Sequence, residues 1–157
     1  MYRRVVTDLE STVLGDELMA TVGALRRLVR RRLRQVVPGP PLRGAQLELM
    51  RVIEQQPGIG IAPAARVLHL AANTVSTLVD QLIDLGMVVR DTDPDDRRAA
   101  RLWLTDSATQ RLAAGRQARM QLMARVVAGL SVAERDALAG ALPALRALVA
   151  VLDAVED

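Results

Sequence analysis

The residues of this chain that are suited to chemistry gather in one charged segment, "DTDPDDRRAARLWLT", at residues 91–105. Four aspartates and three arginines lie there, between the apolar run "GMVV" and the alternating run "RLWL". Asp and Pro are typical of tight turns, and an arginine beside a turn can enter the minor groove of DNA or pair with a carboxylate. The segment therefore predicts a turn between two short strands that presents arginines to an anionic partner.

Other kinds of chemistry find few suitable residues. The chain has no cysteine and a single histidine, His69, which excludes a disulfide scaffold, a thiolate zinc site and a histidine-rich metal site. The sequence shows no nucleophile–base pair and no phosphate-binding glycine loop. We therefore expect neither an enzyme nor a resident metal or cofactor.

The elements that position the charged segment are mostly helices. The chain is 50% hydrophobic and 1% aromatic, and its Leu, Val and Ala residues favour helix–helix packing. Apolar residues recur at spacings of three and four, and Pro and Gly separate these patterns. We expect helices at residues 8–36, 44–56, 62–69, 71–86, 106–129 and 132–155, and strands at 87–90 and 101–104.

Two helices joined by a tight turn and followed by a β-hairpin form a winged helix-turn-helix. The predicted fold class is therefore mainly α with a small β-hairpin wing. A winged helix-turn-helix DNA-binding module covers residues 42–105. Long N- and C-terminal dimerisation helices, at residues 8–36 and 106–155, form a helical dimerisation module because their apolar stripes are too long to leave in water.

Local signals mark the ends of these helices. His69 lies in the turn and tolerates a left-handed backbone better than most residues do. Asn73 is a candidate N-cap of the helix that follows, and Gly86 is placed to cap its C-terminus. Ser131 followed by Glu134 predicts a capping box at the start of the last helix.

The net charge of +3 is unevenly distributed. Residues 1–37 hold eight arginines and four acidic residues, residues 38–105 hold seven and eight, and the remainder holds six of each. A nucleic acid would therefore meet a local arrangement of arginines instead of a broad basic surface. No apolar stretch follows the N-terminal arginines, and no segment reaches ~18 consecutive apolar residues. We expect a soluble, cytoplasmic protein with no membrane segment.

The chain resembles the MarR family of bacterial transcription regulators. The resemblance rests on "TVSTLVDQLIDLGMVVR" (74–90) followed by "DPDDRRAARLWLT" (93–105), flanked by long terminal helices. It implies a homodimer, joined through the terminal helices, that binds double-stranded DNA at an inverted-repeat operator. One helix of each protomer would lie in the major groove and one wing in the adjacent minor groove. The resemblance also implies a repressor that a small phenolic or amphipathic ligand releases from DNA.

The candidate DNA-binding residues lie on the second helix of the motif and on the wing. On the helix, the polar residues opposite the apolar face are Asn73, Thr74, Ser76, Thr77 and Gln81. Short polar side chains at the N-terminal end of such a helix can reach base edges in the major groove.

On the wing, Arg97 is assigned to DNA. Asp80 would repel phosphate if it faced DNA, so we assign Arg98 first to a wing brace with Asp80 and second to DNA. Arg90 is a phosphate candidate for which an ordinary surface arginine is an equal alternative. Gln81 stands where family members often have Arg, which weakens its assignment.

Two alternatives stay open at this stage. A winged helix can also serve as a protein-interaction module without DNA binding, and the acidic balance of residues 38–105 favours that class. The run "RRLVRRRLR" at residues 26–34 either extends the contact with phosphates or is a solvated helix face, and the second interpretation is the usual one.

Overall fold

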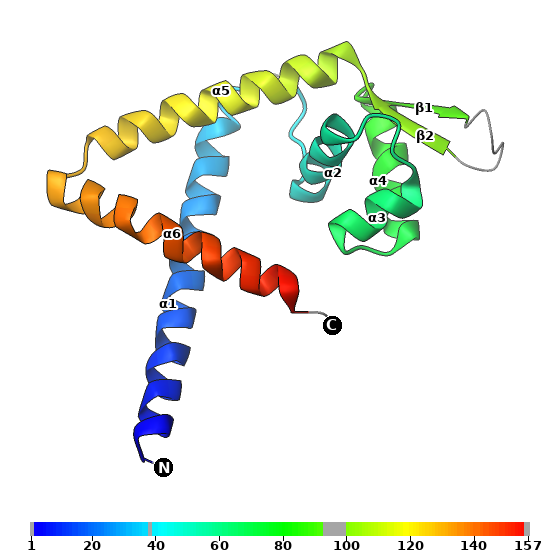
Figure 1. Cartoon of the computed structure of the whole chain (residues 1–157). Coiled ribbons are helices and arrows are strands. Elements are labelled where there is room, and N and C mark those ends of the chain that lie inside the picture. The colour runs from blue at the N-terminus through cyan, green and yellow to red at the C-terminus, as the bar shows by residue number, and fades with distance from the viewer. Residues whose placement is uncertain (1, 38, 93–99, 156–157) are drawn as a thin grey trace. The chain divides into compact units, whose positions relative to one another are not determined.

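The computed structural model describes the backbone of residues 2–37, 39–92 and 100–155 (Figure 1). The helices are α1 (Tyr2–Leu33), α2 (Gly44–Gln55), α3 (Ile61–Leu68), α4 (Ala72–Asp84), α5 (Asp106–Ala128) and α6 (Val132–Ala154), and the strands are β1 (Val88–Thr92) and β2 (Ala100–Leu104). This order confirms the predicted mainly helical fold with a β-hairpin wing. The largest difference is the start of α1, which precedes the expected residue 8.

The chain divides into two compact units, one up to Ala118 and one from Arg119, so that the boundary falls inside α5. The buried core belongs to the first unit. Its fully buried large side chains are Leu49, Met50, Ile53, Val75, Val79, Leu82, Val88 and Leu102. In Figure 1, α2, α3 and α4 cluster around this core, and the hairpin extends beside α4.

The hairpin is antiparallel, and Val88 pairs with Leu104 at its base. Between α2 and α3, Ile59 forms an additional antiparallel bridge with Leu102. The amide of Gly58 donates to the Leu102 carbonyl at 2.9 Å, and the amide of Leu102 donates to the Ile59 carbonyl at 3.1 Å. The wing is therefore anchored to the helical core by backbone hydrogen bonds that the sequence pattern did not indicate.

In the second unit, α6 begins with the predicted capping box. The Ser131 hydroxyl accepts a hydrogen bond from the Glu134 amide, and the Glu134 carboxylate accepts from the Ser131 amide at 2.8 Å. The carboxylate also accepts from the Ser131 hydroxyl, and these hydrogen bonds hold the pKa of Glu134 below its ordinary value of 4.5.

No residue of α6 is buried within the isolated chain. Its mean hydropathy reaches 1.7, so that by length and composition alone α6 is long and apolar enough to cross a membrane. The expectation of no membrane segment rested on the lack of an unbroken apolar run, and α6 meets the averaged criterion although charged residues interrupt it. The apolar side chains of α6 are therefore left uncovered in the isolated chain.

Candidate nucleic-acid interface

The turn between α3 and α4 is built around His69, the described non-glycine residue with a positive φ (φ 50°, ψ 45°). Its amide donates to the Arg66 carbonyl at 3.2 Å, and the amide of Leu70 donates to the Ala65 carbonyl at 3.0 Å. This pair of hydrogen bonds is the Schellman motif, which ends a helix through one left-handed residue. The predicted left-handed conformation of His69 is confirmed, and it sets the direction in which the chain enters α4.

The same motif ends α4, this time at Gly86 with φ +66°. The amide of Gly86 donates to Ile83, and the amide of Met87 donates to Leu82, both at 2.8 Å. The Gly86 carbonyl in turn accepts from the hydroxyl of Thr105 at 2.9 Å, and that hydroxyl accepts from the Ala108 amide at 3.2 Å. Thr105 therefore ties the end of α4 to the start of α5.

One face of α4 is buried and the opposite face is polar. Val75, Leu78, Val79 and Leu82 lie in the core. Among the predicted DNA-binding residues, the side chains of Asn73, Thr74 and Thr77 are exposed, and Ser76 is half-buried. The structure therefore brings the N-terminal polar residues of α4 together on one open face, as a helix in a major groove requires.

Asn73 does not cap α4, and that expectation was wrong. The helix begins at Ala72, its N-cap is Ala71, and no side chain caps it. The Asn73 side-chain oxygen instead accepts a hydrogen bond from the amide of Thr74 at 2.7 Å. The Thr77 hydroxyl donates to the Asn73 carbonyl at 3.0 Å, which leaves its oxygen lone pairs directed outward as acceptors.

Gln81 lies on the side of α4 that meets α2. Its side-chain oxygen accepts a hydrogen bond at 2.9 Å from the amide nitrogen of Gln46, a buried residue of α2. The oxygen of Gln46 accepts at 2.8 Å from the backbone amide of Arg43, the N-cap of α2. One buried side chain thus completes the start of α2 and fixes α4 against it, a role that local sequence patterns did not reveal.

The described part of the wing places two further candidates. Arg90 on β1 lies with its guanidinium 4.0 Å from the carboxylate of Asp80 on α4, and both side chains are exposed. Such an exposed pair at this distance contributes little stability. Arg97 and Arg98 fall outside the described residues, so the assignments of Arg97 to DNA and of Arg98 to Asp80 stay predictions.

Trp103 covers the turn that precedes α3. It pairs with Val89 across the hairpin and remains 39% exposed, on the face opposite buried Leu102. Gly58 has φ +81°, and a Cβ atom there would lie 3.0 Å from a ring carbon of Trp103. Only glycine fits this position, because the backbone is left-handed and the indole ring occupies the space of a side chain.

Comparison with known proteins shows which proteins this chain resembles. Residues 42–100 match the family model described as "MarR family". A curated relative from Thauera aromatica, named as a candidate transcriptional regulatory protein for the hcr operon, is 36% identical over 97 residues. The winged-helix module of this chain is therefore similar to the MarR family. The aligned residues cover 62% of this chain and 58% of that relative.

Solved structures share the fold over most of the chain. The crystal structure of RV1404 from Mycobacterium tuberculosis superimposes with a TM-score of 0.76 at 22% identity, covering 88% of this chain and 92% of that one. A MepR mutant from S. aureus, bound to an oligodeoxyribonucleotide, superimposes with a TM-score of 0.63 at 19% identity, covering 84% and 94%.

The two helices of the motif have no hydroxyl caps. The N-caps of α3 and α4 are Gly60 and Ala71, and neither forms a side-chain hydrogen bond. Phosphate contacts at these helix ends would therefore have to come from backbone amides. Within the described residues, no group of His, Cys, Asp or Glu side chains is arranged to hold a metal ion.

Proposed function

We propose that this protein is a dimeric, sequence-specific DNA-binding transcription regulator that reads the major groove with α4. The observation that carries the proposal is the polar face of α4, where Asn73, Thr74 and Thr77 are exposed opposite the buried apolar face. The left-handed turn at His69 and the tie from Thr105 to Gly86 hold α4 at both ends. A rigidly held helix with short polar side chains at its N-terminal end suits base recognition.

The roles of individual residues follow from their chemistry. Asn73 is the residue best suited to a bidentate contact with adenine, and Thr77 offers acceptor lone pairs and a methyl group. Ser76 is half-buried and reaches less far. Gln81 keeps its amide nitrogen for DNA, while its oxygen is held by Gln46. Arg90 supplies phosphate contact from the strand beside α4.

On the wing, we assign Arg97 to the minor groove and Arg98 to the brace with Asp80. A narrow minor groove attracts a guanidinium through its negative potential. Asp80 lies exposed on α4, where an unpaired carboxylate would repel phosphate, and Arg90 at 4.0 Å is too distant to neutralise it fully. A second arginine from the wing would complete this pairing.

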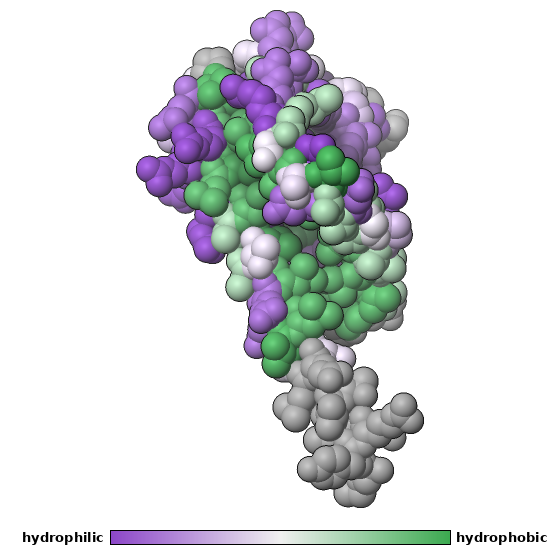
Figure 2. Space-filling view, turned by 90° about the vertical axis from the view of Figure 1, so that its left-hand side faces the viewer, coloured by the Kyte–Doolittle hydropathy of each residue, from purple (hydrophilic) through white to green (hydrophobic). Residues whose placement is uncertain are grey.

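A homodimer explains the exposed apolar side chains. On α6 the exposed large apolar residues are Val132, Leu138, Leu142, Leu145, Leu148, Val149, Val151 and Leu152. Figure 2 shows hydrophobic residues lying open on the surface among hydrophilic ones. A helix that is apolar on most sides is buried against a partner or inserted in a membrane. Arg146 near the middle of α6 makes insertion costly, about 2.5–3.5 kcal/mol, so we assign the partner to a second copy and the protein to the cytoplasm.

Repression relieved by a small phenolic or amphipathic ligand is the regulation we propose. In a dimer, the two copies of α4 meet half-sites about one helical turn apart, ~10 bp. A ligand that prefers a different spacing of these helices shifts the protein away from DNA only by that difference in affinity.

The test is selection of bound duplexes from a random double-stranded pool, followed by a salt titration of the enriched sequences. We expect an inverted repeat that is bound with a steep salt dependence, because each phosphate contact releases counterions. An absence of enrichment at low salt would favour the protein-interaction class instead. Chromatography at the mass of a monomer would contradict the dimer.

A further inference from the structure

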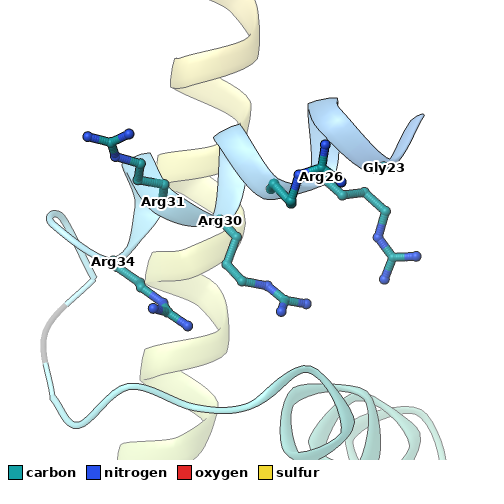
Figure 3. Close-up of a pocket in the computed structure, with 6 residues that line it drawn as sticks. Gly23, Arg26, Arg30, Arg31 and Arg34 are labelled. Atoms are coloured by element: carbon teal, nitrogen blue, oxygen red, sulfur yellow. The ribbon is translucent and has the colours of Figure 1, made fainter. Parts of the chain in front are cut away.

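The C-terminal half of α1 carries five arginines, at positions 26, 27, 30, 31 and 32, and a sixth, Arg34, follows directly after the helix. These six are not balanced locally, since no acidic residue lies between Glu17 and Glu48. Five of them, with Gly23, line a hollow of about 400 Å³ along the helix. Figure 3 shows Arg30, on α1, and Arg34, just past its end, projecting to the same side. The hollow is called the arginine groove below and comprises Gly23, Arg26, Arg27, Arg30, Arg31 and Arg34.

Arginines so arranged destabilise the helix that carries them. Arg26 and Arg30, Arg27 and Arg31, and Arg30 and Arg34 are like-charge pairs at i and i+4, which oppose helix formation. Among the described side chains, none of the groove arginines forms an ion pair with a carboxylate; the described ion pairs involve Arg51, Arg90 and Arg116. An anion bound between these arginines would relieve the repulsion between their guanidinium groups.

The helix dipole accounts for only part of this run. Cations stabilise the last turn of a helix, and α1 ends at Leu33, so Arg30, Arg31 and Arg32 are explained in this way. The effect falls off within one turn. Arg26 and Arg27 lie a full turn earlier, and the dipole does not explain them.

We propose that the arginine groove binds a ligand with adjacent phosphate groups. Guanidinium groups bind phosphate oxygens through paired hydrogen bonds, and Arg26, Arg30 and Arg34 follow one another at about 6 Å along the helix, roughly 12 Å in all. Gly23 leaves one end of the groove without a side chain. The volume suits a small molecule, and a lining whose charged groups are all guanidiniums suits a highly charged one.

Adjacent phosphate groups can come from two sources: a free polyphosphate or nucleotide, and the backbone of DNA flanking the operator. Arg30 also contacts the DNA-binding module, because a Cβ atom at Gly44, the first residue of α2, would lie 2.9 Å from its guanidinium. The groove therefore lies beside the start of α2. The inference rests on the proposed function only for the second source.

The experiment uses the full-length protein and inorganic triphosphate, titrated by calorimetry at low salt. The variant is Arg26→Gln with Arg34→Gln, and the charge-matched control is Arg66→Gln with Arg125→Gln. Circular dichroism verifies that both variants remain folded. We expect triphosphate binding by the wild type and the control, and at least tenfold weaker binding by the groove variant.

A second measurement identifies the source. If DNA is the ligand, the logarithmic salt slope of operator binding falls by about 1.8 per protomer in the groove variant, since two phosphate contacts are lost, and triphosphate competes with DNA. If a free polyphosphate is the ligand, that slope stays unchanged while triphosphate binding is lost. The proposal would be overturned if all three proteins bound triphosphate equally. It would also be overturned if the wild type did not bind triphosphate and the salt slope of operator binding were the same in the groove variant and the wild type. Calorimetry needs no operator, so failure of the proposed function is distinguishable from failure of the groove.

Discussion

Replacing His69 with glycine should stabilise the protein. At φ 50° and ψ 45° the residue occupies the left-handed region, which costs an L-amino acid about 1–2 kcal/mol. Glycine removes this cost and adds about 0.5–1 kcal/mol of entropy to the unfolded chain. The difference leaves His69→Gly more stable by about 0.5–1 kcal/mol, which raises the melting temperature by about 1–4 °C for a chain of this size.

Thermal unfolding followed by circular dichroism measures the change. Protein concentration must be fixed, because the melting temperature of a dimer depends on it. The emission of Trp103, the single tryptophan, reports on the same module because its ring lies against Gly58. His69→Ala is the control: it removes the imidazole and keeps the left-handed cost, so it should show no gain. A His69→Gly protein that melts at or below the wild-type temperature would refute the reasoning.

Three further predictions concern other contacts. Leu102→Ala should cost about 2–5 kcal/mol in urea unfolding, since Leu102 is fully buried in the middle of β2, where the wing meets Ile59. A loss below about 1 kcal/mol would show that the wing is not anchored there. Gln46→Leu should lower the free energy of unfolding by about 1–3 kcal/mol, because it leaves Gln81 and the start of α2 without their hydrogen-bond partner. Adding Gln81→Leu should recover part of that loss. No recovery in the double variant would argue against the pairing. Because the folded pKa of Glu134 is depressed, its carboxylate stabilises the protein above the unfolded pKa and this contribution is lost as pH falls through the folded pKa. Ser131→Ala should return the pKa of Glu134 towards 4.5 in an NMR titration, and an unchanged value would contradict the capping contact.

The helices and the left-handed turn could be predicted from the sequence because their signals are local. Apolar periodicity marks α2 and α4 within a few residues of their ends, and the residue between two helical patterns must turn the chain, which pointed to His69. Gly86 is a comparable case, since glycine is the usual residue for a left-handed helix end.

Contacts between distant residues were not predictable in the same way. Gln46 and Gln81 are 35 positions apart, and nothing in either helix pattern distinguishes this pair from two ordinary surface glutamines. The bridge from Ile59 to Leu102 joins a loop to a strand and has no periodic signal. Asn73 was predicted as a cap from its residue type, but Ala71 starts the turn into α4 two residues earlier.

The most direct test of the account is the affinity of Asn73→Ala for the selected operator, compared with wild type. Asn73 is exposed and forms only local hydrogen bonds, so its loss should leave the fold intact. The account predicts operator binding weaker by about 1–3 kcal/mol, roughly 5- to 150-fold, with binding to unrelated DNA unchanged. Asp84→Ala, at the far end of α4, is the control and should keep operator affinity. Equal operator affinity of Asn73→Ala, Thr77→Val and wild type would contradict the claim that the polar face of α4 reads DNA.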